Sequence, residues 1–158
     1  MSPTDAPPVR FVDRTDDAGR FFATLPPDWQ GDIVPRWPSY RGAARVFTFE
    51  GADDEVLGGG IVFDRVSPDT EAYRGVAEAW FAQGHRYVGF LWIAEHQRGR
   101  SLGSRWLAAL RTLFPEQPFW LSVEDEGLVP FYERNGFRRA GTVQGPGGPE
   151  WILASGPM

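Results

Sequence analysis

The feature that most constrains the fold of this chain is a continuously apolar run, RYVGFLWIA at residues 86–94, which leads into a polar turn and then a helix. An apolar run of this kind is typical of a central strand that is buried on both faces of a sheet. The stretch QRGRSLGSRWLAALR at residues 97–111 begins with small and polar residues, which leave the backbone almost bare where the helix starts. Because a helix N-terminus carries free N–H groups and a partial positive charge, this turn is a candidate anion site.

The length and composition of the chain favour a single folded domain. Of its 158 residues, 42% are hydrophobic and 15% are aromatic, which is enough to build a core and argues against disorder. The Pro-rich residues 1–8 are expected to form a flexible tail, followed by one domain over residues 9–158. The absence of cysteine excludes disulfides and a cysteine nucleophile, and a cytoplasmic location is expected. No membrane span or signal peptide is expected, because no long apolar run and no charged-then-apolar N-terminus is present.

The distribution of charge favours a small cationic substrate over nucleic acid. The formal net charge is −5, which disfavours nonspecific binding to nucleic acid, although a negative surface also simply keeps a protein soluble. Four arginines and no acid lie between Arg98 and Arg111. An acidic chain therefore places local positive charge at the start of a helix, where an anion could use it.

The spacing of apolar residues predicts a chain that alternates strands with helices. The expected strands are 9–14, 44–50, 56–66, 86–94, 118–124, 138–143 and 150–155. The expected helices are 15–25, 67–84, a segment that begins within 97–111, and 128–137. Glycines 58–60 interrupt the third strand and indicate a bulge, a close approach by another group, or an irregular strand without a partner. Residues 26–43 hold four prolines and are expected to form a long aromatic loop, with room for a short helix.

The turn before the helix lacks the common phosphate-binding motifs but resembles another one. It contains neither G-x-x-x-x-G-K-[ST] nor G-x-G-x-x-G. Arg98-Gly99-Arg100-Ser101-Leu102-Gly103 resembles the pyrophosphate loop of the GNAT acetyltransferase superfamily, whose pattern is Gln/Arg-x-x-Gly-x-Gly/Ala. The later segment DEGLVPFYERNGF, at residues 125–137, is similar to the family segment that ends in Tyr-x-x-x-Gly-Phe.

This resemblance implies the fold, the cosubstrate and the residues that bind it. The fold is expected to be α/β (α+β), a mixed and mostly antiparallel sheet with helices on both faces. Acetyl-CoA is expected as cosubstrate, its pyrophosphate on the backbone of the loop and its pantetheine arm along the edge of the 86–94 strand. Ser101 replaces a usual glycine, and Asp125 replaces a common asparagine, which puts the role of Asp125 in doubt. The residues implied in acetyl-CoA binding are Trp92, Ile93, Arg98, Gly99, Arg100, Ser101, Leu102, Gly103, Ser104 and Asp125.

The resemblance also implies a general acid, whereas the general base stays open. Tyr132 corresponds to the family's acid, and a phenol with a pKa of about 10 can protonate a leaving thiolate. Relatives that use a glutamate in the central strand have no counterpart here, because residues 86–94 contain no carboxylate. Glu124 and His85 are the candidate bases, and a base that acts through water is a further alternative.

Four aromatic residues are candidates for the acceptor side, although core packing would explain them equally well. They lie in the loop region that often lines the acceptor pocket in this family and in the helix that follows the third strand. These candidates are Trp29, Trp37, Tyr40 and Tyr73.

Together these features predict transfer of an acetyl group from acetyl-CoA to a primary amine on a small molecule or peptide, without a metal. His85 and His96, at opposite ends of one strand, do not make a metal site. The alternatives are a non-catalytic module that senses acyl-CoA and a structural or partner-binding domain. No nucleic-acid or membrane partner is expected, and a homodimer is among the assemblies that the sequence allows.

Overall fold

The computed structural model describes residues 9–157, so the tail predicted at residues 1–8 lies outside the described part. The strands are β1 (Arg10–Asp13), β2 (Ala44–Glu50), β3 (Val56–Phe63), β4 (Arg86–Ile93), β5 (Phe119–Val123), β6 (Arg138–Gly145) and β7 (Gly148–Ser155). The α-helices are α1 (Gly19–Phe22), α2 (Pro27–Ile33), α3 (Trp37–Tyr40), α4 (Arg74–Ala82), α5 (Leu102–Leu113) and α6 (Val129–Arg134). The 3-10 turns are η1 (Ala52–Asp54), η2 (Pro68–Tyr73), η3 (Glu95–Gln97) and η4 (Glu126–Leu128).

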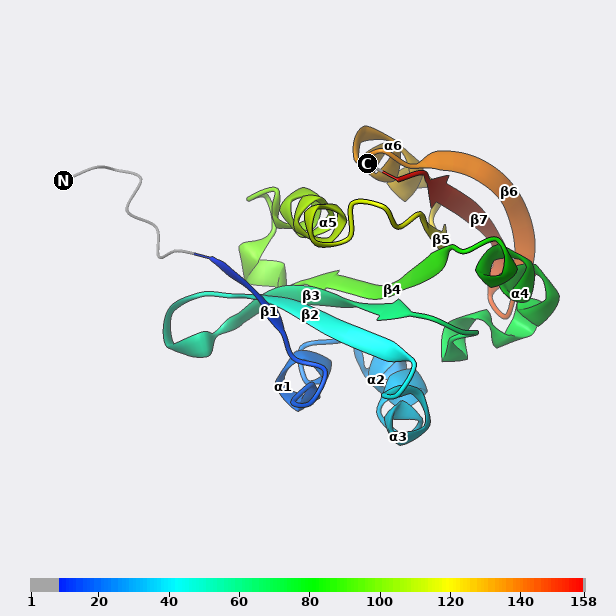
Figure 1. The fold of residues 1–158 in the computed structure, drawn as a ribbon. Coiled ribbons are helices and arrows are strands. Elements are labelled where there is room, and N and C mark those ends of the chain that lie inside the picture. Colours follow the sequence, from blue (N-terminus) through cyan, green and yellow to red (C-terminus); the bar gives the residue numbers. More distant parts are fainter. Residues whose placement is uncertain (1–8, 158) are drawn as a thin grey trace.

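The strands form one sheet in the order β1-β2-β3-β4-β5-β7-β6, and every neighbouring pair in it is antiparallel except β4 with β5. Figure 1 shows α1, α2 and α3 on one face of the sheet and α5 and α6 on the other. The predicted fold class, a mostly antiparallel mixed sheet with helices on both faces, is therefore confirmed.

The glycines at 58–60 lie in a strand that other groups approach closely on both faces. β3 stays paired to β2 through this stretch, and its register with β4 shifts between Gly59 and Ile61. A Cβ at Gly59 would lie 2.7 Å from the Phe47 carbonyl oxygen, and one at Gly60 would lie 2.8 Å from the Trp106 ring. Of the interpretations that the sequence left open, the structure shows both the bulge and the close approach.

Trp106 fixes α5 against the sheet and thereby sets where this helix begins. Its side chain is completely buried, and its indole N–H donates to the Phe47 carbonyl at 3.0 Å. A buried tryptophan contributes a large apolar area but needs a partner for its N–H, and Phe47 supplies that partner. The start of α5 is therefore held beside the end of β4, which precedes it in the chain.

The structure departs from the predicted helix at 15–25, because side chains hold its first residues to the sheet. The backbone N–H and the hydroxyl of Thr15 both donate to Asp13, and the same hydroxyl accepts from the Val46 N–H at 3.0 Å. Helix α1 begins only at Gly19. The region predicted as a long loop with room for a short helix holds two short helices, α2 and α3, and Pro27 sits in the first turn of α2, where its missing N–H costs nothing.

The helix predicted at 67–84 divides into η2 and α4. A reciprocal pair of hydrogen bonds between Ser67 and Thr70 caps the start of η2. Trp80 of α4 then stacks on Trp120 of β5, with ring centroids 6.2 Å apart.

In the part of the chain that the structure describes, no helix has the length and apolar character needed to cross a membrane.

Candidate active site

The most distinctive feature of the sheet is the place where β4 and β5 separate. Their parallel pairing covers only Arg86 with Phe119 and Tyr87 with Trp120. Beyond these pairs β4 remains bonded to β3, while β5 remains bonded to β7 as far as Val123. Among residues 9–157, the edge of β4 that faces β5 thus has no strand partner after Tyr87, and a wedge-shaped gap opens.

A bulge in β4 accompanies this separation. The register with β3 shifts where Phe90 and Leu91 lie opposite Gly60, and Phe90 has a φ of +55°. A bulky side chain rarely adopts this left-handed conformation, and such outliers concentrate at functional sites. The bulge re-aims the backbone of β4 beside the gap, as β-bulges commonly do next to active sites.

The gap contains a cavity of about 350 Å³, here named the β4–β5 cleft. Six of its lining residues carry carboxylates, and within residues 9–157 no arginine or histidine lines it. The acids come from α2, η2, β7 and the segment just after β5. The lining consists of Asp28, Trp29, Asp32, Asp69, Tyr87, Val88, Gly89, Phe90, Leu91, Leu121, Ser122, Val123, Glu124, Asp125, Leu128, Tyr132 and Glu150.

Tyr132, the predicted general acid, lies in the wall of this cleft. Helix α6 carries it, and its ring packs edge-on against Phe131 and Phe137 at centroid distances of 4.9 and 5.9 Å. Burial raises the pKa of the Tyr132 phenol to about 12, because the phenolate would lose its hydration. The hydroxyl therefore stays protonated at neutral pH, which is the state a proton donor requires.

Two acids of the cleft are more buried than the rest, and sequence analysis did not single them out. Asp69 of η2 accepts from the Tyr87 hydroxyl at 2.5 Å, and Glu150 of β7 accepts from the Tyr73 hydroxyl at 2.9 Å. Burial raises the pKa of both carboxyls above their ordinary values.

The loop before α5 has the backbone geometry of an anion cradle. Gly99 has a φ of +85° and Ser101, the residue before the helix, has a φ of +58°. The first helical N–H bond at this end runs from Arg105 to the Ser101 carbonyl at 3.0 Å. The N–H groups of residues 102–104 lie in the first turn of the helix, where no preceding helical carbonyl can accept them.

The four arginines of this segment divide into two groups. Arg98 and Arg100 are exposed at the helix start, and the Arg98 guanidinium lies 4.5 Å above the Trp92 ring and donates to the Ile93 carbonyl. Arg105 instead lies over the Phe49 ring, and Arg111 donates to the Asn135 carbonyl. Only the first two therefore lie where a bound anion would be.

Three other residues of the predicted pyrophosphate loop also serve the packing of α5. Leu102 is 2% exposed and belongs to the core. A Cβ at Gly103 would lie 3.0 Å from Phe131 of α6, and Ser104 accepts a hydrogen bond from the Asn135 side chain at 3.1 Å. These contacts place the loop and the helix that carries Tyr132 side by side.

The remaining predicted cosubstrate residues lie near the cleft in different ways. Trp92 and Ile93 end β4 beyond the residues that line the cleft. Asp125 lines the cleft, and its Oδ1 accepts from the Gly127 N–H at 2.8 Å. Its carboxylate thus caps η4.

The two candidate bases from the sequence occupy different positions. Glu124 is exposed at the rim of the cleft. His85 does not line the cleft and lies just before β4, where its ring packs against Trp80 at 4.9 Å. Burial lowers the pKa of the His85 imidazole. The structure therefore brings only Glu124 of these two to the site.

The four residues predicted for the acceptor side also occupy different positions relative to the cleft. Trp29 lines the cleft and packs edge-on against Trp92 at 5.4 Å. Tyr73 lies behind the lining, where its hydroxyl contacts Ser122 and Glu150. Trp37 and Tyr40 do not reach the cleft, because Trp37 packs on Phe22 and Tyr40 on Phe63 in the layer of helices beneath the sheet. For these last two, packing is the role that the structure shows.

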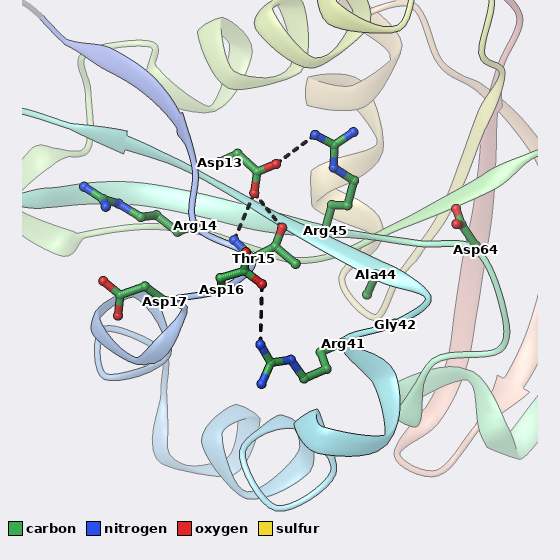
Figure 2. Close-up of a pocket in the computed structure, with 10 residues that line it drawn as sticks. All are labelled: Asp13, Arg14, Thr15, Asp16, Asp17, Arg41, Gly42, Ala44, Arg45 and Asp64. Atoms are coloured by element: carbon green, nitrogen blue, oxygen red, sulfur yellow. Dashed lines mark hydrogen bonds and ion pairs between the residues drawn. The ribbon is translucent and has the colours of Figure 1, made fainter.

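A second hollow, of about 560 Å³, lies where β1 and β2 meet the helices beneath the sheet (Figure 2). Its charges neutralise one another: Asp13 pairs with Arg45 at 2.7 Å, and Asp16 pairs with Arg41 at 3.4 Å. Within residues 9–157 none of the residues predicted for catalysis or cosubstrate binding lines it. The β4–β5 cleft is therefore the better candidate active site.

Comparison with known proteins finds a matching family model and similar folds. The model of the acetyltransferase (GNAT) family matches residues 15–137, a range that includes the cleft-lining α2, β4, β5 and α6. No curated protein matches the chain.

Solved structures show the same fold at low sequence identity. A protein from Bordetella pertussis assigned as a GNAT-family acetyltransferase is 18% identical, with a TM-score of 0.69, over 92% of this chain and 95% of that one. FeeM, an N-acyl amino acid synthase from uncultured soil microbes, is 16% identical, with a TM-score of 0.68, over 95% and 91%. A GNAT-family acetyltransferase from Staphylococcus aureus Mu50 is 11% identical, with a TM-score of 0.63, over 94% and 99%.

Proposed function

The chain belongs to the acetyltransferase (GNAT) family, and we propose that it transfers the acetyl group of acetyl-CoA to a primary amine that carries positive charge. The observation that carries this proposal is the β4–β5 cleft, which joins a free strand edge, a general-acid candidate and a wall of carboxylates. The proposal therefore places the thioester where β4 and β5 separate.

The chain offers a matching surface for each part of acetyl-CoA. The N–H groups at the start of α5, with Arg98 and Arg100 beside them, would hold the pyrophosphate. The free edge of β4 would pair with the amide groups of the pantetheine arm, as an extended ligand pairs with an exposed strand. The positive loop and the acidic cleft thus lie at opposite ends of the same proposed ligand.

The carboxylates favour a cationic acceptor over an anionic or neutral one. Asp28 and Asp32, four residues apart on α2, face the cleft together, and Glu124 lies at its rim. Because protonated amines are attracted to such a wall, the cleft would raise the local concentration of an ammonium substrate. A substrate with its own carboxylate beside the amine would be repelled.

Tyr132 would supply the proton that the leaving thiolate takes. As the amine nitrogen bonds to the carbonyl carbon, the C–S bond breaks and negative charge collects on sulfur. Tyr132 is protonated at neutral pH because burial raises its pKa to about 12. A donor of this kind accelerates thiolate departure without a metal.

The test is release of CoA thiol from acetyl-CoA by the purified protein with a panel of acceptors. The panel contains diamines, triamines, aminoglycosides, amino acids and peptides, together with the alcohol that matches each simple amine. We expect thiol release with the cationic amines, and none with the alcohols. The chain contains no lysine, so mass spectrometry will find the acetyl group on the added amine with little background from the protein. Tight binding of acetyl-CoA without thiol release for any amine would instead support an acyl-CoA sensor.

A further inference from the structure

A continuous chain of hydrogen-bonded side chains crosses the floor of the β4–β5 cleft. The Tyr87 hydroxyl donates to Asp69 Oδ2 at 2.5 Å and lies 3.3 Å from the Ser122 hydroxyl. The Ser122 hydroxyl lies 2.6 Å from the Tyr73 hydroxyl, which donates to Glu150 Oε1 at 2.9 Å. The chain therefore links two carboxylates through three hydroxyls contributed by η2, β4 and β5.

The proton count along this chain sets its direction. Each tyrosine has one hydroxyl proton, and each donates it to a carboxylate. Ser122 is therefore the donor in its bond with Tyr73. Tyr73 and Ser122 both direct hydrogen bonds toward the Glu150 end, which favours the ionised form of that carboxylate although burial opposes it.

The second oxygen of Glu150 lies close to the backbone of β6. A Cβ built on Gly145 of β6 would lie 1.9 Å from Glu150 Oε2. The hydrogen bond from Tyr73 fixes the other oxygen and thereby orients the carboxylate. Glu150 itself is 5% exposed and lines the cleft.

We propose that Glu150 is the general base that takes the proton from the acceptor ammonium, and that Tyr73 and Ser122 are positioning residues that hold its carboxylate toward the cleft. This inference rests on the proposed amine acetylation. It assigns the base to β7 and not to Glu124, which is exposed at the rim of the cleft.

The proposed step balances in atoms and charge. The acceptor R–NH3+ gives one proton to Glu150, which later passes it to solvent. The free amine then bonds to the acetyl carbon, the C–S bond breaks, and Tyr132 gives its proton to sulfur. The second proton leaves the nitrogen as the amide forms and restores Tyr132 through solvent. The products are the N-acetylated amine, CoA thiol and one proton.

The groups that face Glu150 increase its affinity for a proton. Tyr73 and Asp69 face it from η2, Glu124 faces it from the segment just after β5, and Tyr132 of α6 shares the cleft wall with it. On β6 the opposite residue, Val143, and the nearby Gly145 carry no charge. Burial and the neighbouring negative charges raise the pKa of Glu150, so its affinity for a proton exceeds that of an ordinary carboxylate.

The test compares the pH dependence of kcat/KM for the acceptor in the parent protein, Glu150→Gln and Glu124→Gln. In the parent, kcat/KM rises as Glu150 ionises and then becomes level. Glu150→Gln keeps the shape of the side chain but removes the base. We expect its kcat/KM at pH 7 to fall by about 10²–10⁴-fold. Its kcat/KM should then rise about tenfold per pH unit up to the pKa of the amine, because only free amine reacts.

One further variant, Ser122→Ala, and the control Glu124→Gln separate the base from a structural role. Ser122→Ala removes the hydroxyl that bonds to Tyr73, and Tyr73 then holds the Glu150 carboxylate less firmly. We expect this variant to lower kcat/KM and to shift the acid limb of the profile without changing the KM for acetyl-CoA. Glu124→Gln should keep the acid limb, which moves to lower pH because one negative charge near Glu150 is removed.

A parent-like profile for Glu150→Gln, or a lost acid limb in Glu124→Gln alone, would overturn the inference while amine acetylation stands. Absence of thiol release by the parent with every amine would overturn the proposed function and this inference together.

Discussion

Asp125 shows how a single side chain at the site can serve the backbone around it. Its Oδ1 accepts from the Gly127 N–H at 2.8 Å, which caps η4, the turn that leads into α6 and Tyr132. An asparagine, which is common here in the resembling family, has an oxygen in the same place. The departure at this position therefore preserves the cap and changes only the charge.

We predict that Asp125→Ala lowers the free energy of unfolding by about 1 kcal/mol, the usual cost of a lost cap, while Asp125→Asn stays close to the parent. Urea denaturation measures both. Equal losses for alanine and asparagine would show that the carboxylate acts through its charge.

At the residue scale the sequence predicted Tyr132 but not Glu150. Tyr132 belongs to a short motif whose spacing to Gly136 and Phe137 can be read locally, and the structure places it at the cleft. Glu150 meets Tyr73 across 77 positions of sequence, and no local pattern encodes that contact. The only signal was a carboxylate in EWILAS, a strand whose other residues are mostly apolar on both faces.

Among the elements, α5 combines a packing role with the proposed binding of the pyrophosphate. Its Gly103 and Ser104 contact α6, so substitutions there would disturb folding as well as binding. Arg100 is exposed, and its guanidinium donates to the side chain of nearby Gln97. Arg100 is therefore the cleaner position at which to test the anion site.

We predict that Arg100→Glu weakens acetyl-CoA binding about ten- to a hundredfold, because a cation beside the phosphates becomes an anion. The matched control Arg36→Glu, an identical charge change at an exposed position outside the cleft, should bind like the parent. Isothermal titration calorimetry at low and high salt measures the effect, which should shrink as salt increases. Equal weakening by both variants would mean that net charge, and not this site, controls affinity.

The glycines of β3 give a second prediction at this scale. Gly60→Ala would bring a Cβ to 2.8 Å from the Trp106 ring and should lower the free energy of unfolding by about 1–3 kcal/mol. Gly75→Ala, in α4 with open space around it, should raise stability by about 0.5–1 kcal/mol. Chemical denaturation of both proteins measures the sign of each change in the free energy of unfolding. A Gly60→Ala protein as stable as the parent would show that the Trp106 ring can move away from residue 60.

Elements were predicted well where the apolar pattern alone decides them and less well where side chains intervene. All seven expected strands are present, with ends that differ by a few residues. The helix expected at 15–25 is shorter than predicted because Thr15 is bonded to the sheet, where its hydroxyl accepts from the Val46 N–H. The helices within 26–43 were hidden because prolines mark both the ends and the starts of helices.

At the scale of the whole molecule, the site is produced by the way the sheet divides. The register shift in β3–β4 and the short β4–β5 pairing open a wedge in an otherwise continuous sheet. Periodicity predicts strands but not their neighbours, so the mixed, mostly antiparallel sheet was expected only from the family resemblance, and its strand order was not predicted. The wall of carboxylates could not be predicted, because four distant segments contribute it.

The central claim, that the β4–β5 cleft performs acetyl transfer with Tyr132 as acid, is tested most directly by single-turnover kinetics. CoA release from bound acetyl-CoA is measured after mixing with an acceptor amine, for the parent, Tyr132→Phe and the control Tyr40→Phe. We predict that Tyr132→Phe keeps the parent's melting temperature and acetyl-CoA affinity but releases CoA about 10²–10⁴-fold more slowly, while Tyr40→Phe matches the parent rate. An unchanged rate in Tyr132→Phe would contradict the account, as would a loss of rate that merely follows a loss of stability.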